Sequence, residues 1–156
     1  MNIWFKSNCL TPGNNYHEIF NIATATQEYE FAINKNGFFR GGMKISGTRY
    51  VANTANLELL DGNWHMLTMT YDGANLIRYV DSIERSRTEI IGTLTGDCKF
   101  MLGHYGTNTS YYAKEAYLSD VRIYATALTE KQIKELYDTA ATVDNFGNLY
   151  VREAIE

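Results

Sequence analysis

The stretch that decides the fold is Trp64-His65-Met66-Leu67-Thr68-Met69-Thr70-Tyr71-Asp72-Gly73. It is rich in the aromatic and β-branched residues that suit a pleated, half-buried surface. Asp61-Gly62-Asn63 before it and Asp72-Gly73 at its end are turn signals. We therefore predict a strand from Trp64 to Tyr71, followed by a turn into a second strand from Leu76 to Asp81.

Shorter strand signals recur on both sides of this stretch. Ile3-Trp4-Phe5 is apolar on both faces, as expected of a central strand. Residues 28–33 alternate between apolar and other residues and lead into Asn34-Lys35-Asn36-Gly37, which predicts a hairpin. Many short strands separated by turns favour an all-β antiparallel sandwich or jelly roll over alternating strand and helix units. Further strand signals are Met43–Ile45, Arg49–Val51, Phe100–Gly103 and Ala116–Tyr124.

One helix is predicted near the C-terminus. Thr129 and Gln132 have the spacing of a capping box, and Leu128 and Ile133 have the spacing of a hydrophobic staple. We expect a short α-helix over residues 129–139, with one apolar stripe packed on the sandwich.

Composition limits the classes of function. The chain has 156 residues, 45% of them hydrophobic, which suffices for one sizeable core and one domain. Its net charge of −4, with acidic and basic residues interspersed, argues against nucleic acid as a partner. No apolar run approaches the roughly 20 residues of a membrane span, so we expect no membrane insertion. Residues 1–6 do not read as a signal peptide.

The two cysteines do not read as a functional pair. Cys9 and Cys98 lie far apart and fit no metal-ligand or redox spacing. We expect two buried, reduced thiols rather than a disulfide.

The order of motifs resembles a known family. A Trp64-His65 pair opens a strand that ends in Tyr71-Asp72-Gly73, and Tyr79-Val80-Asp81 lies in the next strand. Further on, Asp120-Val121-Arg122-Ile123-Tyr124 is followed by Ala127-Leu128-Thr129 and the helix. This order is similar to that of concanavalin A-like, laminin G-like jelly-roll domains, strongly over residues 61–138 and weakly to the N-terminus. Such domains occur in bacteriophage tail and bacterial surface proteins, and the family binds surfaces more often than it catalyses reactions.

The sequence departs from the family at its start and in one turn. Family members usually have one or two strands ahead of the position that Trp4 matches, so the first strand or strands are expected to be missing. Either the chain is an excised fragment, or a neighbouring segment or another subunit donates the missing strand, in which case a homo-oligomer is one expected outcome. Asp81-Ser82 stands where many relatives have Asp-Gly, so Ser82 needs another turn geometry or a positive φ.

The family resemblance raises the question of calcium. Some relatives hold a structural calcium with acidic residues near the last strand, where this chain has Ser119-Asp120. Ca²⁺ prefers six to eight oxygen ligands, usually with several carboxylates. We therefore predict no cofactor and expect Asp120 to hydrogen-bond a neighbouring loop or to pair with Arg122 or another basic residue. A calcium ion bound through backbone carbonyls stays unsupported.

Catalysis is not supported by any motif. Retaining glycoside hydrolases need two carboxylates about 5 Å apart, and the Glu-x-Asp-x-x-Glu pattern of the enzymes with this fold is absent. Glu28 and Glu30 have a suitable spacing, but their alternation with apolar residues predicts a solvated face. His65 is expected to be structural, and His17 and His104 are isolated. We expect no enzyme and no catalytic residues.

Binding is therefore the predicted role. The segment from His104 to Tyr112 mixes tyrosines with Asn, Thr and Ser, a composition that suits stacking on sugar rings and hydrogen bonding to hydroxyls. The alternative is that its tyrosines only pack across the end of the sandwich. A second polar-aromatic loop is expected at residues 14–17, while Trp64, Tyr71, Tyr79 and Tyr124 are assigned to packing. The carbohydrate-binding residues predicted are Tyr105, Asn108, Tyr111 and Tyr112.

The sequence thus predicts a laminin G-like domain at residues 1–140 and a C-terminal extension at residues 141–156, with an edge strand at Leu149-Tyr150-Val151. The expected partner is a glycan or cell-surface polysaccharide, and the expected location is a virion or an extracellular surface. Two alternatives stay open: a structural protein-protein module of a fibre, and a hydrolase whose acids are not recognised.

Overall fold

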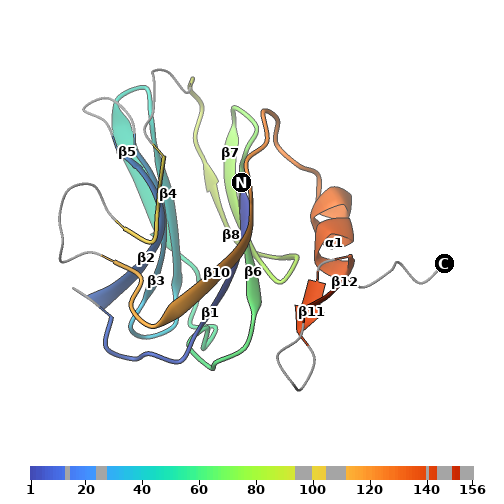
Figure 1. Ribbon diagram of the computed structural model, residues 1–156. Helices are drawn as coiled ribbons and strands as arrows, with labels where there is room; N and C mark the ends of the chain where they lie inside the picture. The colour runs from blue at the N-terminus through green and yellow to red at the C-terminus, as the bar shows by residue number, and fades with distance from the viewer. Residues whose placement is uncertain are drawn as a thin grey trace.

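Two five-stranded antiparallel sheets pack face to face in the computed structural model (Figure 1). The structure describes residues 1–12, 15–23, 28–93, 100–104, 112–139, 141–143 and 149–151. One sheet, here the helix-side sheet, has the strand order β10-β1-β6-β7-β8, and the opposite sheet has the order β5-β4-β3-β2-β9. The elements are β1 (Asn2–Ser7), β2 (Tyr16–Ala23), β3 (Glu28–Asn34), β4 (Phe39–Ile45), β5 (Thr48–Asn53), β6 (His65–Tyr71), β7 (Asn75–Val80), β8 (Ile83–Glu89), β9 (Phe100–Leu102), β10 (Ala116–Arg122), α1 (Glu130–Asp138), β11 (Ala141–Val143) and β12 (Leu149–Val151).

The predicted all-β sandwich with one short helix is confirmed. β6 and β7 form the expected antiparallel pair, and β1 is central because it pairs with both β6 and β10. The amide of Gly37 donates to the carbonyl of Asn34, which closes the predicted hairpin between β3 and β4. Leu149–Val151 is a strand as predicted, and it pairs with β11 in a separate two-stranded ribbon.

Two strands of the sandwich were not predicted, and neither was β11 of the separate ribbon. Tyr16 and His17, expected in a loop, begin β2, and His17 is fully buried with its ring edge on Phe5. Turn-forming residues just before Tyr16 gave this region the appearance of a loop. β8 was missed because its sequence, Ile83 to Glu89, is dominated by charged residues, which suit an edge strand more than a buried one.

The core lies between the sheets and follows the period of two in each strand. Ile3 and Phe5 of β1 pack with Phe31 of β3 and Phe39 of β4, and all four side chains are fully buried. Cys9 is also buried and has a free thiol, as predicted. Cys98 lies outside the described residues.

The helix covers the outer face of the helix-side sheet (Figure 1). The predicted capping box forms: the Thr129 hydroxyl accepts from the amide of Gln132, and the Gln132 side chain accepts from the amide of Thr129. Ile133 is fully buried against the strands, and the Tyr137 ring stacks on Trp4 with centroids 5.7 Å apart. One of the two outer faces of the sandwich is therefore closed by aromatic and aliphatic packing.

The turn between β7 and β8 holds two residues in a left-handed backbone conformation. Asp81 and Ser82 both have positive φ, 52° and 65°, as a two-residue hairpin turn requires. The expected penalty at Ser82 is thus present, because residues with a Cβ pay for this conformation. We expect Ser82→Gly to raise the free energy of unfolding by about 0.5 to 1 kcal/mol, measured by chemical denaturation. The same substitution at Ser86, inside β8, should destabilise the protein; a loss of stability at Ser82 as well would contradict this reading.

Candidate functional site

The outer face of the opposite sheet is polar. Residues that pair across neighbouring strands point to the same side of a sheet. Phe31 and Ile33 point into the core, so their neighbour Glu30 points outward, as do its partners Asn21 and Gly42. The pairing also places the apolar residues Ala32, Val51 and Met101 on this face. We call the face the outer polar face after its charged and polar side chains, which include Tyr16, Glu18, Asn21, Glu30, Arg40, Lys44 and Arg49.

Glu30 is the centre of this face. It is only 4% exposed, and its Oε1 accepts a hydrogen bond from Arg40 Nε at 2.6 Å. Its Oε2 accepts a second bond from the guanidinium of Arg49. The prediction that Glu30 lies on a solvated face is therefore wrong, because arginines from the two next strands cover its carboxylate. Glu28 was predicted to lie on the same solvated face, but its side chain is outside the described part of the structure.

Tyr16 and Arg40 extend the cluster along the sheet. Arg40 Nη1 donates to the Tyr16 hydroxyl at 3.1 Å, and the Arg40 guanidinium lies 5.1 Å from the centroid of the Tyr16 ring. An arginine over an aromatic face is a favourable cation–π contact. Strands, ion pairs and this contact together hold the polar groups in fixed positions.

The side-chain amide of Asn21, which pairs with Glu30 across β2 and β3, is a further polar group of this sheet. The Asn21 side chain is fully buried, and among the described residues neither its amide oxygen nor its amide nitrogen has a hydrogen-bond partner. An unsatisfied buried polar group costs roughly 1 to 3 kcal/mol. The Asn21 amide lies beneath the polar surface and is not open to solvent.

The predicted binding loop leaves the edge of this same sheet. β9 pairs with β2, and His104 forms an isolated bridge with Tyr112 just beyond β9. Tyr112 is 39% exposed. Tyr105, Asn108 and Tyr111 lie outside the described residues, so their role as binding residues stays a prediction.

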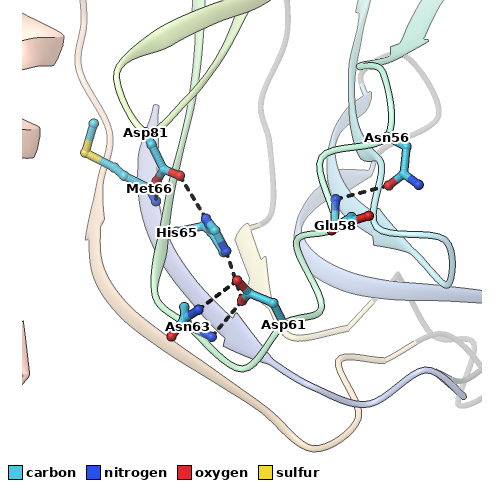
Figure 2. A network of polar contacts seen from close by, with 7 residues as sticks. All are labelled: Asn56, Glu58, Asp61, Asn63, His65, Met66 and Asp81. Atoms are coloured by element: carbon cyan, nitrogen blue, oxygen red, sulfur yellow. Dashed lines mark hydrogen bonds and ion pairs between the residues drawn. The ribbon is translucent and has the colours of Figure 1, made fainter. Parts of the chain in front are cut away.

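The histidine in β6 is part of a structural network (Figure 2). His65 Nδ1 lies 2.8 Å from Asp81 Oδ2, and His65 Nε2 lies 3.2 Å from Asp61 Oδ1. Asp81 Oδ1 also accepts from the amide of Met66 at 2.9 Å, which joins the β7–β8 turn to β6. His65 is thus held between two carboxylates from two different loops, and both of its ring nitrogens have partners, as expected of a satisfied histidine.

The geometry of this network makes stability depend on pH. Burial opposes the charged form of His65, but the hydrogen bonds and charges of Asp81 and Asp61 outweigh it and raise the pKa of His65. A histidine whose pKa is raised by folding contributes stability below its ordinary pKa of 6.5 and loses that contribution as pH rises through the raised value.

We therefore expect the free energy of unfolding to fall from pH 6.5 upward, and Asp81→Asn to flatten this dependence. The substitution keeps the acceptor for Met66 and tolerates positive φ, but it removes the charge that faces the imidazole. Denaturant titrations at pH 5.5 to 8.5 measure the slope, with Asp138→Asn in the helix as the matched control. Equal slopes in the wild-type protein and in Asp81→Asn would disprove the proposed coupling.

Asp120 and His17 each have a local partner. Asp120 Oδ1 accepts from Arg122 Nε at 2.6 Å, which is the predicted ion pair. His17 Nε2 lies 2.8 Å from the carbonyl of Cys9, inside the core. Within the described residues, no group of three or more His, Cys, Asp or Glu side chains is placed to hold a metal ion. No helix there is both long and apolar enough to cross a membrane.

Similar folds occur in glycan- and receptor-binding proteins. The Ruminococcus gnavus IT-sialidase CBM40 bound to α2,3-sialyllactose superposes with a TM-score of 0.64 at 12% identity, covering 87% of this chain and 80% of that one. The receptor-binding domain of botulinum neurotoxin D superposes with a TM-score of 0.69 at 14% identity, covering 95% of this chain and 39% of that one. Domains LG4-5 of the mouse laminin α1 chain give a TM-score of 0.64 at 15% identity, covering 83% of this chain and 36% of that one.

These likenesses establish the fold rather than the ligand, because all three identities are low. The chain spans less than two fifths of the laminin segment, and about two fifths of the toxin domain. Comparison with curated proteins gives no match. A family model described as the concanavalin A-like lectin/glucanases superfamily, of the laminin G type, matches residues 1–134, and this chain therefore belongs to that family.

Proposed function

We propose that this domain is a non-catalytic carbohydrate-binding module whose ligand lies on the outer polar face of the opposite sheet. The observation that carries the proposal is the difference between the two outer faces. Helix α1 closes one face with Ile133 and the Trp4–Tyr137 stack. The other face presents the guanidinium groups of Arg40 and Arg49 and the phenol of Tyr16 on its strands, held by the buried carboxylate of Glu30.

The chemistry of this face suits sugar hydroxyls. A hydroxyl is both donor and acceptor, so neighbouring guanidinium and phenol groups can bind adjacent hydroxyls of one ring. Arg40 and Arg49, held in place by the buried carboxylate of Glu30, supply partly exposed guanidinium donors, and Tyr16 supplies the phenol. Groups held on strands lose little entropy on binding.

The wider setting is part of the proposal. The domain acts as a recognition module of a bacteriophage tail, another virion-surface protein or a bacterial surface protein, where a cell-surface polysaccharide is its partner. The fold is shared with a CBM40 module solved with sialyllactose, which supports a sugar ligand. A structural module of a fibre is the alternative.

The test compares one arginine on each outer face. Arg40→Gln removes a charged donor from the outer polar face, while Arg87→Gln breaks an exposed ion pair with Glu84 on the helix-side sheet. Binding of lactose, 3′-sialyllactose, xylohexaose, chitohexaose and purified bacterial polysaccharides is measured by array and calorimetry. We expect at least one glycan to bind the wild-type protein and Arg87→Gln equally, and to bind Arg40→Gln at least tenfold more weakly.

Two results would overturn the proposal. Absence of binding to every glycan and to bacterial cell walls would favour the structural module. Release of reducing sugar from a bound polysaccharide would show that the domain is an enzyme. Tyr112→Ala, tested in parallel, reports whether the loop beside β9 takes part in binding.

A further inference from the structure

A second candidate site lies away from the outer polar face, at the end of the sandwich where β6 and β10 finish. It is a cleft of about 550 Å³ between the two sheets. Its principal side chains are Tyr29, Met43, Met69, Tyr71 and Tyr124, and we call it the tyrosine–methionine cleft. Ligand sites for small molecules usually measure 300 to 1,000 Å³, so this volume suits one small molecule.

The inner part of the cleft is apolar and well fixed. Met43 and Met69 are 4% and 3% exposed, and both belong to the core cluster. Tyr29 pairs with Met43 across β3 and β4. The Tyr71 hydroxyl donates to the carbonyls of Gly92 at 2.7 Å and Ile90 at 3.2 Å. Thioether and aromatic groups make favourable contacts with an apolar ring or chain.

Among the described residues, the charged side chain that lines the cleft is acidic. Of the described residues that line it, none is Lys or Arg, and Asp72 supplies a carboxylate. The amides of Ala74 and Asn75 donate to Asp72 Oδ1 at 2.8 and 2.6 Å, and these bonds lower the pKa of the Asp72 carboxyl, which is therefore ionised at neutral pH.

Two cationic groups near the cleft do not offset the negative charge of Asp72. The Met1 amine donates to the carbonyl of Met69 at 2.9 Å, and burial lowers its pKa to about 6, so it is mostly uncharged at pH 7.5. Arg122, next to the lining residue Ile123, is paired with Asp120. The cleft therefore favours a cationic head group and disfavours an anionic one.

We propose that the tyrosine–methionine cleft binds a small amphipathic amine, with an aromatic or alkyl body over Met43 and Met69 and its ammonium group beside Asp72. The apolar body replaces water on the methionine and tyrosine side chains. The ammonium stays at the open mouth, where it interacts with the carboxylate and with tyrosine rings without the cost of full burial. This site is separate from the proposed glycan site and does not depend on it.

The experiment uses three probes of one shape: 4-butylbenzylamine, 4-butylbenzyl alcohol and 4-butylbenzoate, titrated at pH 7.5. The ¹³C-methyl NMR signals of Met43 and Met69 locate the site, and the titration gives the affinity. We expect both signals to shift saturably with the amine, with an affinity about two- to fivefold above that of the alcohol, as an exposed ion pair allows. The benzoate should bind more weakly than the alcohol.

Asp72→Asn separates charge from shape. It keeps the Oδ1 acceptor of the turn, and it should remove the preference for the amine over the alcohol while both still bind. Asp138→Asn, the same change on the helix, should leave the preference intact. Absence of methionine shifts with all three probes would overturn the proposal, as would equal binding of benzoate and amine, or an unchanged amine preference in Asp72→Asn.

Discussion

Arg78→Ala should lower the free energy of unfolding by about 3 to 5 kcal/mol, because it combines a core cavity with lost hydrogen bonds. Arg78 is fully buried between the sheets, and burial lowers its pKa to about 10, so the guanidinium stays charged at neutral pH. Its Nε donates to the carbonyl of Gly41 at 2.8 Å, and Nη1 donates to the Thr88 hydroxyl at 3.1 Å. The residue thus joins β7 and β8 to β4, the strand that carries Arg40.

The size of the effect is checked by chemical denaturation, with Arg78→Met as the companion variant. Methionine keeps most of the volume and removes the cost of a buried charge, so its loss should be at most half that of alanine. Gly41 has to remain small for the contact, since a Cβ there would lie 3.2 Å from both Arg78 Nε and Met69 Sδ. A loss below 1 kcal/mol in Arg78→Ala would show that Arg78 does not hold the sheets together.

Glu30→Gln should weaken both stability and glycan binding. Removing one partner of a fully buried ion pair costs about 3 to 5 kcal/mol, but the Arg40 and Arg49 side chains are 23% and 41% exposed. Solvent screens part of their charge, so we expect a loss of about 2 to 3 kcal/mol. Glycan affinity should fall at least tenfold, because the two guanidinium groups lose their common anchor.

The matched control is Glu84→Gln, which breaks the exposed pair with Arg87 on the helix-side sheet. An exposed pair of this kind contributes about 0 to 1 kcal/mol. Denaturation and glycan titration on both variants give the comparison. Equal losses in Glu30→Gln and Glu84→Gln would refute the special role of the buried carboxylate.

The fold was predictable where the signals are local. The β6 stretch, the hairpin at Asn34 to Gly37 and the capping box at Thr129 each depend on residues close in sequence, and all three form as predicted. The strain at Ser82 was predictable for the same reason, because a two-residue turn dictates its own φ values.

The outer polar face was not predictable from its alternation pattern. The pattern in β3 correctly separates Glu30 from Phe31, but it cannot show that Arg40 and Arg49, on two other strands, cover the carboxylate. That information depends on strand order and register, which are long-range properties. The signal that could have suggested it is the set of basic residues on one face of the two strands after β3: Arg40 and Lys44 of β4, and Arg49 of β5.

The predicted loop site remains untested by the structure. Tyr112 lies next to the edge strand β9, and this position is compatible with a role in binding at this sheet. The predictions of a donated first strand, of an oligomer and of a boundary at residue 140 likewise stay predictions. β1 has hydrogen-bonded neighbours on both sides, so strand donation, if it occurs, involves another strand of the sandwich.

The most direct measurement of the central claim follows the arginine Nε–H signals by ¹⁵N NMR while a bound glycan from the array is titrated. The account predicts that the Arg40 signal shifts saturably, with the dissociation constant found by calorimetry, while the signals of Arg87 and Arg122 stay in place. Both controls lie outside the outer polar face, in ion pairs with Glu84 and Asp120. A saturable shift of Arg87 with Arg40 unchanged would place the ligand on the helix-side sheet and contradict the account.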